Sequence, residues 1–117
     1  MNAIKIIYNL VNFNIKPIYE DSIRNSDFED PSSEEAIKEI DKKFSEWEEY
    51  CQKNMNFIDS HEESGSWGES YISGYRWEGN LILPNDEVKN GEFLAILEKG
   101  ANDTGDVWAS LTIYEIY

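Results

Sequence analysis

The chain has 117 residues, and its 24 Asp and Glu residues outnumber its 10 Lys and Arg residues, which gives a formal net charge of −14. Composition of this kind bears on partners and solubility more than on fold, and it favours a strongly basic partner. It argues against direct nucleic-acid binding, which relies on basic patches that this sequence lacks. The length corresponds to a single domain, 1–117, and the 40% apolar and 14% aromatic content is enough for a packed core.

Cys51 is the only cysteine, so an intrachain disulfide is excluded. A lone thiol is typical of a reducing compartment. The apolar start of the chain carries Lys5 and is followed by no small-residue cleavage signal, so it does not resemble a signal peptide. No stretch approaches the roughly 20 apolar residues of a membrane span. We therefore expect a soluble, cytoplasmic protein that makes no membrane contact and acts as a monomer.

The first elements are ambiguous. Residues 3–13 fit both a helical spacing and a strand alternation of apolar residues, and we favour a short helix. Residues 19–35 are rich in Asp, Glu, Ser and Asn, and we expect a long loop there. Asp30 or Ser32 is suited to cap the following helix, and Ser32 with Glu35 has the spacing of a capping box.

Residues 33–54 are predicted to form the main helix. A single apolar stripe recurs at steps of three and four residues, and its members are Ile37, Ile40, Phe44, Trp47 and Cys51. The stripe is too short for a persuasive coiled coil, so we expect the helix to pack on a sheet.

The second half of the chain has the alternation and punctuation of strands. Strands are predicted at 69–77, 81–83, 92–99 and 106–116, with a tight turn at 78–80 and a hairpin loop across 100–105. The last of these strands is apolar on both faces, which indicates a central position under the helix. The expected fold is α+β, with one or two helices packed on an antiparallel sheet of three to four strands.

Catalytic and metal-binding motifs are weak. His61 is the sole histidine and lies among Asp59, Glu62 and Glu63, where it could act as a base or ligand, but we interpret it as a solvated loop residue. Cys51 lies on the apolar stripe and is expected in the core. Residues 102–106 lack the ligand pattern of a calcium loop. We expect no enzyme activity, no cofactor and no metal site.

Trp67 is the aromatic residue most suited to an interface, because glycines lie close to it on both sides and no strand pattern holds it. The alternative is that its ring packs as a lid over the sheet edge. Acidic residues gather near it and in the loop before the main helix. The predicted partner-binding residues are Asp27, Glu29, Asp30, Glu62, Glu63, Trp67 and Glu69.

In size, acid surplus and single cysteine, and in the stretches EDSIRNSDFED and DSHEESGSWGES, the chain resembles the small acidic immunity proteins of contact-dependent growth inhibition and colicin systems. That resemblance implies a cytoplasmic protein that binds and neutralises a basic toxin domain, in particular a nuclease. An alternative is a nucleic-acid-mimicking inhibitor of a restriction or CRISPR-type defence enzyme. A third possibility is a small hydrolase or metal-dependent enzyme that uses His61.

Overall fold

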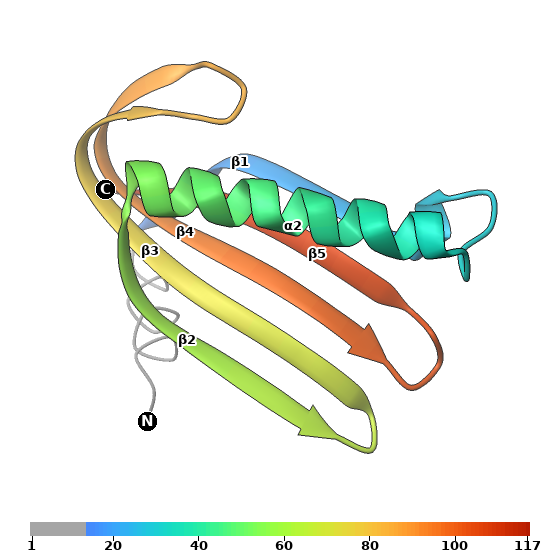
Figure 1. Ribbon diagram of the computed structural model, residues 1–117. Helices are drawn as coiled ribbons and strands as arrows, with labels where there is room; N and C mark the ends of the chain where they lie inside the picture. Colours follow the sequence, from blue (N-terminus) through green and yellow to red (C-terminus); the bar gives the residue numbers. More distant parts are fainter. Residues whose placement is uncertain (1–13) are drawn as a thin grey trace.

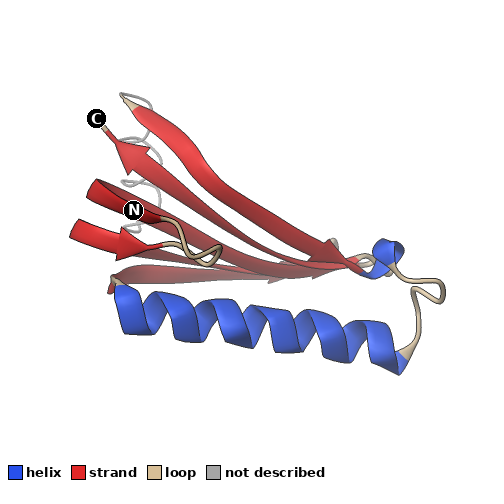
Figure 2. Ribbon diagram, turned by 90° about the horizontal axis from the view of Figure 1, so that it is seen from above, coloured by secondary structure: helices blue, strands red, loops and turns tan. Residues whose placement is uncertain are grey.

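A computed structural model describes residues 14–117 as one helix packed on one face of a five-stranded antiparallel sheet (Figures 1 and 2). The strand order is β1-β5-β4-β3-β2, so β1 and β2 form the two edges. The elements are β1 (Ile15–Arg24), the 3-10 turn η1 (Asn25–Asp27), α2 (Glu34–Asn54), β2 (Asn56–Gly65), β3 (Gly68–Ile82), β4 (Val88–Asn102) and β5 (Val107–Ile116).

The fold class is α+β, as expected, but the details differ. The sheet has five strands rather than three to four, and residues 14–117 contain one α-helix. The favoured helix at residues 3–13 lies outside the described residues.

Helix α2 confirms the prediction from the apolar stripe. Its buried side chains are Ala36, Ile40, Phe44, Trp47 and Cys51, whereas Ile37 is only half-buried. The predicted cap was wrong by one position, because Ser33 rather than Asp30 or Ser32 caps the helix. The Ala36 N–H donates to Ser33 Oγ at 3.1 Å, which satisfies one of the free donors in the first turn.

The predicted loop at residues 19–35 was wrong in its first part, because β1 runs through Ile15–Arg24 and pairs with β5. Tyr19, Asp21 and Ile23 lie on the same face of β1, and Tyr19 and Ile23 pack against the core. Because the acidic Asp21 stands between the two apolar residues, the apolar alternation of this strand is interrupted. Its partner strand lies at the far end of the sequence. Local composition therefore suggested a loop, while the pairing with β5 makes the segment a strand.

Two further predictions about strands need correction. Residues 78–80 do not form a turn, because β3 continues to Ile82 and Gly79 pairs with Gly91 of β4. Both glycines have positive φ, 124° and 157°, and in Figure 1 the far ends of β3 and β4 curl away from the sheet. The segment that contains His61 is strand β2 rather than a loop.

The predicted hairpin between the last two strands is confirmed. Strands β4 and β5 pair from Glu92↔Ile116 to Ala101↔Val107, and the turn between them follows Asn102. β5 has β1 on one side and β4 on the other, and its residues Ala109, Leu111 and Ile113 lie fully buried in the core. This is the interior position that its sequence indicated.

The core lies between α2 and the sheet. Phe93, Ala95 and Leu97 of β4 alternate toward the helix side and are fully buried, as the two-residue period of a strand requires. Leu94 and Ile96 belong to a smaller cluster on the opposite face. Both faces of the central strand are therefore apolar.

One close approach in the sheet can be tested directly. Gly100 pairs with Trp108, and a Cβ atom built on Gly100 would overlap Cζ2 of the indole. We expect Gly100→Ala to destabilise the fold by roughly 1–3 kcal/mol, because the ring must move. In a Trp108→Ala background the same change should cost much less. Urea unfolding of the four proteins measures both costs, and equal costs in the two backgrounds would contradict the packing described here.

The buried thiol of Cys51 predicts alkaline sensitivity. Burial, with a smaller contribution from the charge of Glu48, raises the pKa of the thiol from its ordinary value of 9.0 to about 12. The folded-state pKa lies above the unfolded one, so this stability is fully present below pH 9.0 and is lost as the pH rises toward about 12. Burial also raises the pKa of four tyrosines, Tyr19, Tyr50, Tyr75 and Tyr114.

We therefore expect the free energy of unfolding to fall above pH 9.0 with a slope of up to about 1.4 kcal/mol per pH unit from the thiol alone. Urea unfolding at a series of alkaline pH values measures this slope. Cys51→Ala removes the titrating group and should flatten the curve, while lowering stability at neutral pH through lost packing. An unchanged slope in that variant would show that the thiol does not contribute.

Candidate functional site

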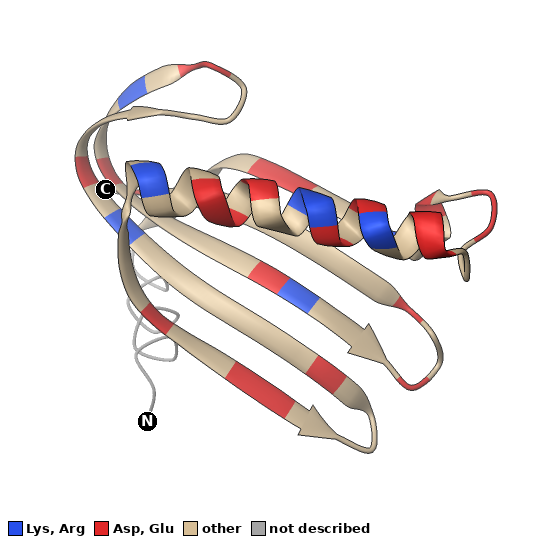
Figure 3. Cartoon of the chain, viewed as in Figure 1, with Lys and Arg blue, Asp and Glu red and all other residues tan. Residues whose placement is uncertain are grey.

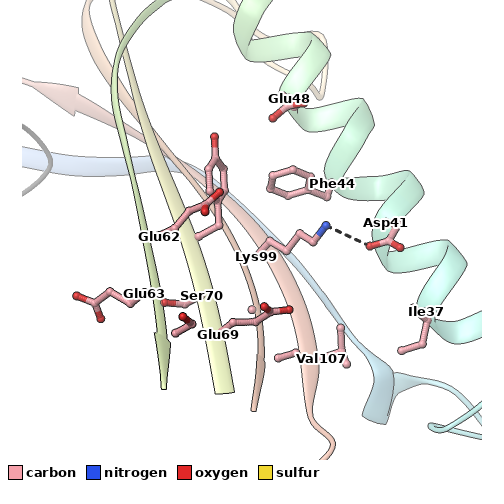
Figure 4. A pocket seen from close by; sticks show the side chains of 14 residues that line it. Ile37, Asp41, Phe44, Glu48, Glu62, Glu63, Glu69, Ser70, Lys99 and Val107 are labelled. Atoms are coloured by element: carbon pink, nitrogen blue, oxygen red, sulfur yellow. Dashed lines mark ion pairs between the residues drawn. The ribbon is translucent and has the colours of Figure 1, made fainter. Parts of the chain in front are cut away.

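A groove with a volume of about 790 Å³ lies between α2 and the β2–β3 hairpin (Figure 4). One wall comes from the helix and the other from the ends of β2, β3, β4 and β5. Its lining residues are Ile37, Asp41, Phe44, Glu48, Glu62, Glu63, Ser64, Glu69, Ser70, Tyr71, Lys99, Gly100, Ala101 and Val107.

The helix wall follows from helical periodicity. Ile37, Asp41, Phe44 and Glu48 recur at steps of four, three and four, so they form one stripe along α2. This stripe adjoins the buried stripe and shares Phe44 with it. The helix therefore presents two carboxylates to the groove beside apolar side chains that continue into the core.

The strand wall follows from the register of the hairpin. Glu62 of β2 lies opposite Tyr71 of β3, and Ser64 lies opposite Glu69. Because these pairs are two residues apart, their side chains project from the same face of the sheet. Figure 4 shows the Glu62 side chain on the side of the hairpin that faces the helix.

Negative charge dominates the groove. Four carboxylates face it, those of Asp41, Glu48, Glu62 and Glu69, together with one ammonium group, that of Lys99, whereas the Glu63 side chain projects from the opposite face of the sheet (Figure 4). Acidic residues also extend beyond it along α2, β2 and the loops (Figure 3). A concave surface lined by one sign of charge concentrates the field, and so it attracts cations.

Lys99 shows how a cation is held there. Its Nζ atom lies 3.4 Å from Asp41 Oδ1 and 5.1 Å from the centroid of the Phe44 ring. The Phe44 ring meets Tyr71 edge to face, with 6.0 Å between centroids. The groove therefore combines carboxylates with aromatic faces, both of which bind ammonium and guanidinium groups.

The structure brings two of the predicted side chains together, because Glu62 and Glu69 both face this groove, and Glu63 lies at its border with its side chain on the opposite face of the sheet (Figure 4). Trp67 occupies the turn of the same hairpin, is 43% exposed and does not line the groove. Its ring lies close to Gly65, where an added Cβ would be 3.0 Å from the indole nitrogen. Trp67 is thus partly exposed and partly packed on its own hairpin.

The other three predicted residues lie elsewhere. Glu29 and Asp30 line a second groove of about 590 Å³, where Phe28, Ser33, Glu35, Lys38 and Glu39 complete the lining. Glu35 and Glu39 lie on roughly the opposite side of α2 from the Ile37–Glu48 stripe, given 3.6 residues per turn. Asp27 lines neither groove, and its Oδ2 accepts a hydrogen bond from the Arg24 N–H at 2.9 Å. The predicted residues are therefore divided between two sides of the helix.

Asp41, Glu48 and Lys99 line the groove but were not predicted as binding residues. A signal for the two acids was present, because both fall at helical spacing from Ile37 and Phe44. No sequence signal pointed to Lys99, because its approach to the helix depends on the position of β4 under α2.

The residues considered for catalysis are not assembled into a site. His61 lies on β2 with its Nε2 2.8 Å from Glu63 Oε1, and both side chains are partly exposed. Cys51 is fully buried, as predicted for a core residue. Across residues 14–117 we find no group of three or more His, Cys, Asp or Glu side chains placed to hold a metal ion. In the same part of the chain, no helix has the length and apolar character that a membrane crossing requires.

Comparison with known proteins found no matching protein-family model, no matching curated sequence and no matching solved structure.

Proposed function

We propose that this protein binds and neutralises a basic protein in the cytoplasm, and that its acidic groove is the binding surface. The expected partner is a toxin domain, in particular a nuclease. The observation that supports this proposal is the groove itself, in which the carboxylates of four acidic residues and two aromatic rings surround a single lysine. The protein is proposed to act as a monomer and without a cofactor.

The chemistry of the groove suits lysine and arginine side chains. The carboxylates supply charge-assisted hydrogen bonds, and the edges of the apolar core supply surface that a long aliphatic stem can cover. The negative field would also accelerate the encounter with a basic partner and disfavour acidic ones. A nuclease meets these requirements, because its own active-site surface is basic in order to bind phosphates.

A comparison of two baits tests the proposal. Tagged wild-type protein and a Glu62→Lys/Glu63→Lys variant are used in parallel to capture proteins from the native host, together with the purified product of any adjacent toxin-like gene. A Glu49→Lys/Glu87→Lys variant is the matched control, because it has the same net charge and its substitutions lie outside both grooves.

We expect a basic protein to be retained by the wild type and the control and to be lost with the groove variant. Inhibition of that partner's activity by the wild type and the control, but not by the groove variant, would complete the support. A captured restriction or CRISPR-type enzyme would favour the nucleic-acid mimic instead. Equal retention by all three baits would contradict the groove as the binding surface.

A further inference from the structure

The open edge of the sheet at β2 adjoins the acidic groove. β2 is the last strand in the order, and within residues 14–117 its only strand partner is β3. An edge strand presents unpaired N–H and C=O groups that can pair with a strand of another chain. Glu62, Glu63 and Ser64 belong to this edge and also line the groove.

The hairpin turn identifies which backbone groups point outward. Gly65 and Gly68 are paired across a two-residue turn, so they form a hydrogen-bonded pair. Hydrogen-bonded pairs alternate with non-hydrogen-bonded pairs along an antiparallel ladder. The N–H groups of Ser60, Glu62 and Ser64 therefore point away from β3. The Ser60 N–H donates to Asp59 Oδ1 at 2.9 Å, which leaves Glu62 and Ser64 as the outward donors nearest the groove.

The two edges of the sheet differ in chemistry. β1 carries Pro17, a register shift beside it, Lys16 and Arg24, and such features protect an edge from strand addition. β2 also has an irregularity, between Phe57 and Asp59, but the rest of the strand pairs regularly and contains no proline, lysine or arginine.

The charges and the aromatic residue of β2 indicate the kind of strand that fits. Asp59, Glu62 and Glu63 make this edge acidic, and Phe57 at its start is 57% exposed. A second copy of β2 would place like charges against each other, which is unfavourable. An extended basic segment would instead satisfy both the backbone groups and the carboxylates.

We propose that β2 accepts an extended basic segment of the partner as a sixth strand of the sheet. Alternate side chains of that strand would project toward the helix side and reach the carboxylates of the groove. The preferred segment therefore has lysine or arginine at every second position. This inference rests on the proposed function and adds how the partner is held.

Amide hydrogen exchange tests the pairing without any substitution. The probe is a ten-residue peptide of alternating lysine and threonine, added at low salt to the full-length protein. We expect exchange at the amides of Glu62 and Ser64 to slow by roughly tenfold or more, because each gains a backbone acceptor. The control peptide has the same sequence with alternate backbone nitrogens methylated, so it keeps the charge but cannot pair along one side.

A pair of variants gives an independent measurement. Ser64→Pro removes an outward N–H without changing the charge and without removing a bond to β3, whereas Ser64→Ala retains the N–H. We expect peptide affinity to fall by roughly tenfold in the proline variant and by less than about twofold in the alanine variant. Circular dichroism and exchange at the β4 amides verify that the proline variant is folded.

The outcomes separate the two proposals. Peptide binding with no slowing of exchange at Glu62 and Ser64 would overturn strand addition, while it would leave the groove proposal intact. Absence of peptide binding at low salt would also overturn strand addition. The proposed function is judged separately, by the comparison of baits with the Glu62→Lys/Glu63→Lys variant.

Discussion

Reversing Glu62 and Glu63 to lysine is expected to slow association with the basic partner by roughly tenfold or more at low salt, and to flatten the dependence of that rate on salt. The Glu62 carboxylate lies in the groove, Glu63 lies beside it on the opposite face of β2, and Lys99 already supplies one positive charge in the groove. Reversal would therefore leave the groove itself with three acidic and two basic side chains, and would add a further positive charge on the adjacent edge of β2. Stopped-flow measurements between roughly 0.01 and 0.15 M salt cover the range in which the Debye length falls from about 30 to about 8 Å.

The Glu49→Lys/Glu87→Lys control distinguishes a local effect from one of net charge. Both variants raise the net charge equally, so a pure long-range effect would slow association by a similar factor in each. If the partner contacts the groove directly, the association rate should fall much further for Glu62→Lys/Glu63→Lys than for the control, and dissociation should be faster. If that variant kept the wild-type rate and salt slope, the placement of the interface would be wrong.

Replacing Asn25 with alanine is expected to destabilise the fold by roughly 2–4 kcal/mol, although the residue is polar and lies in a short turn. Asn25 is only 6% exposed. Its Nδ2 donates to Pro31 O at 3.2 Å and to Gly105 O at 2.8 Å, and its Oδ1 accepts from the Val107 N–H at 3.1 Å. One side chain therefore joins the end of β1, the loop before α2 and the β4–β5 hairpin.

Chemical denaturation of Asn25→Ala, Asn25→Asp and Ser26→Ala measures this role. The aspartate side chain keeps the shape of asparagine and its acceptor oxygen, but it lacks the N–H donors of Nδ2. We therefore expect Asn25→Asp to lower the free energy of unfolding at least as much as Asn25→Ala. Ser26 is exposed in the same turn, and its truncation should change stability by no more than about 0.5 kcal/mol. A similarly small change for Asn25→Ala would mean that the three hydrogen bonds are replaced by water.

The elements that could be predicted from sequence are those with strong local patterns. α2 has five apolar residues at helical spacing, and β4 and β5 are long apolar strands joined by a turn rich in Asn, Asp and Gly. The two edge strands were missed. Edge strands are half-solvated, so acids such as Asp21 in β1 and Glu62 in β2 interrupt their alternation.

The candidate site was predictable only in part, for a related reason. The acids of the β2–β3 hairpin are close in sequence, and Glu62 and Glu69 do meet in the groove. Helical spacing places Asp41 and Glu48 on one face of α2, but the position of that face opposite the β2–β3 hairpin is a tertiary arrangement without a local signal. The loop acids Glu29 and Asp30 were grouped with the hairpin by charge alone, and the structure places them in another groove.

The pairing of β1 with β5 has a consequence for how the molecule folds. Ile15 lies opposite Ile116, so β1 remains without its strand partner until β5 has been synthesised. Contacts between residues so distant in sequence carry a large loop-closure entropy and are associated with slow folding. During translation, the apolar side chains of β1 would meanwhile remain accessible to molecular chaperones.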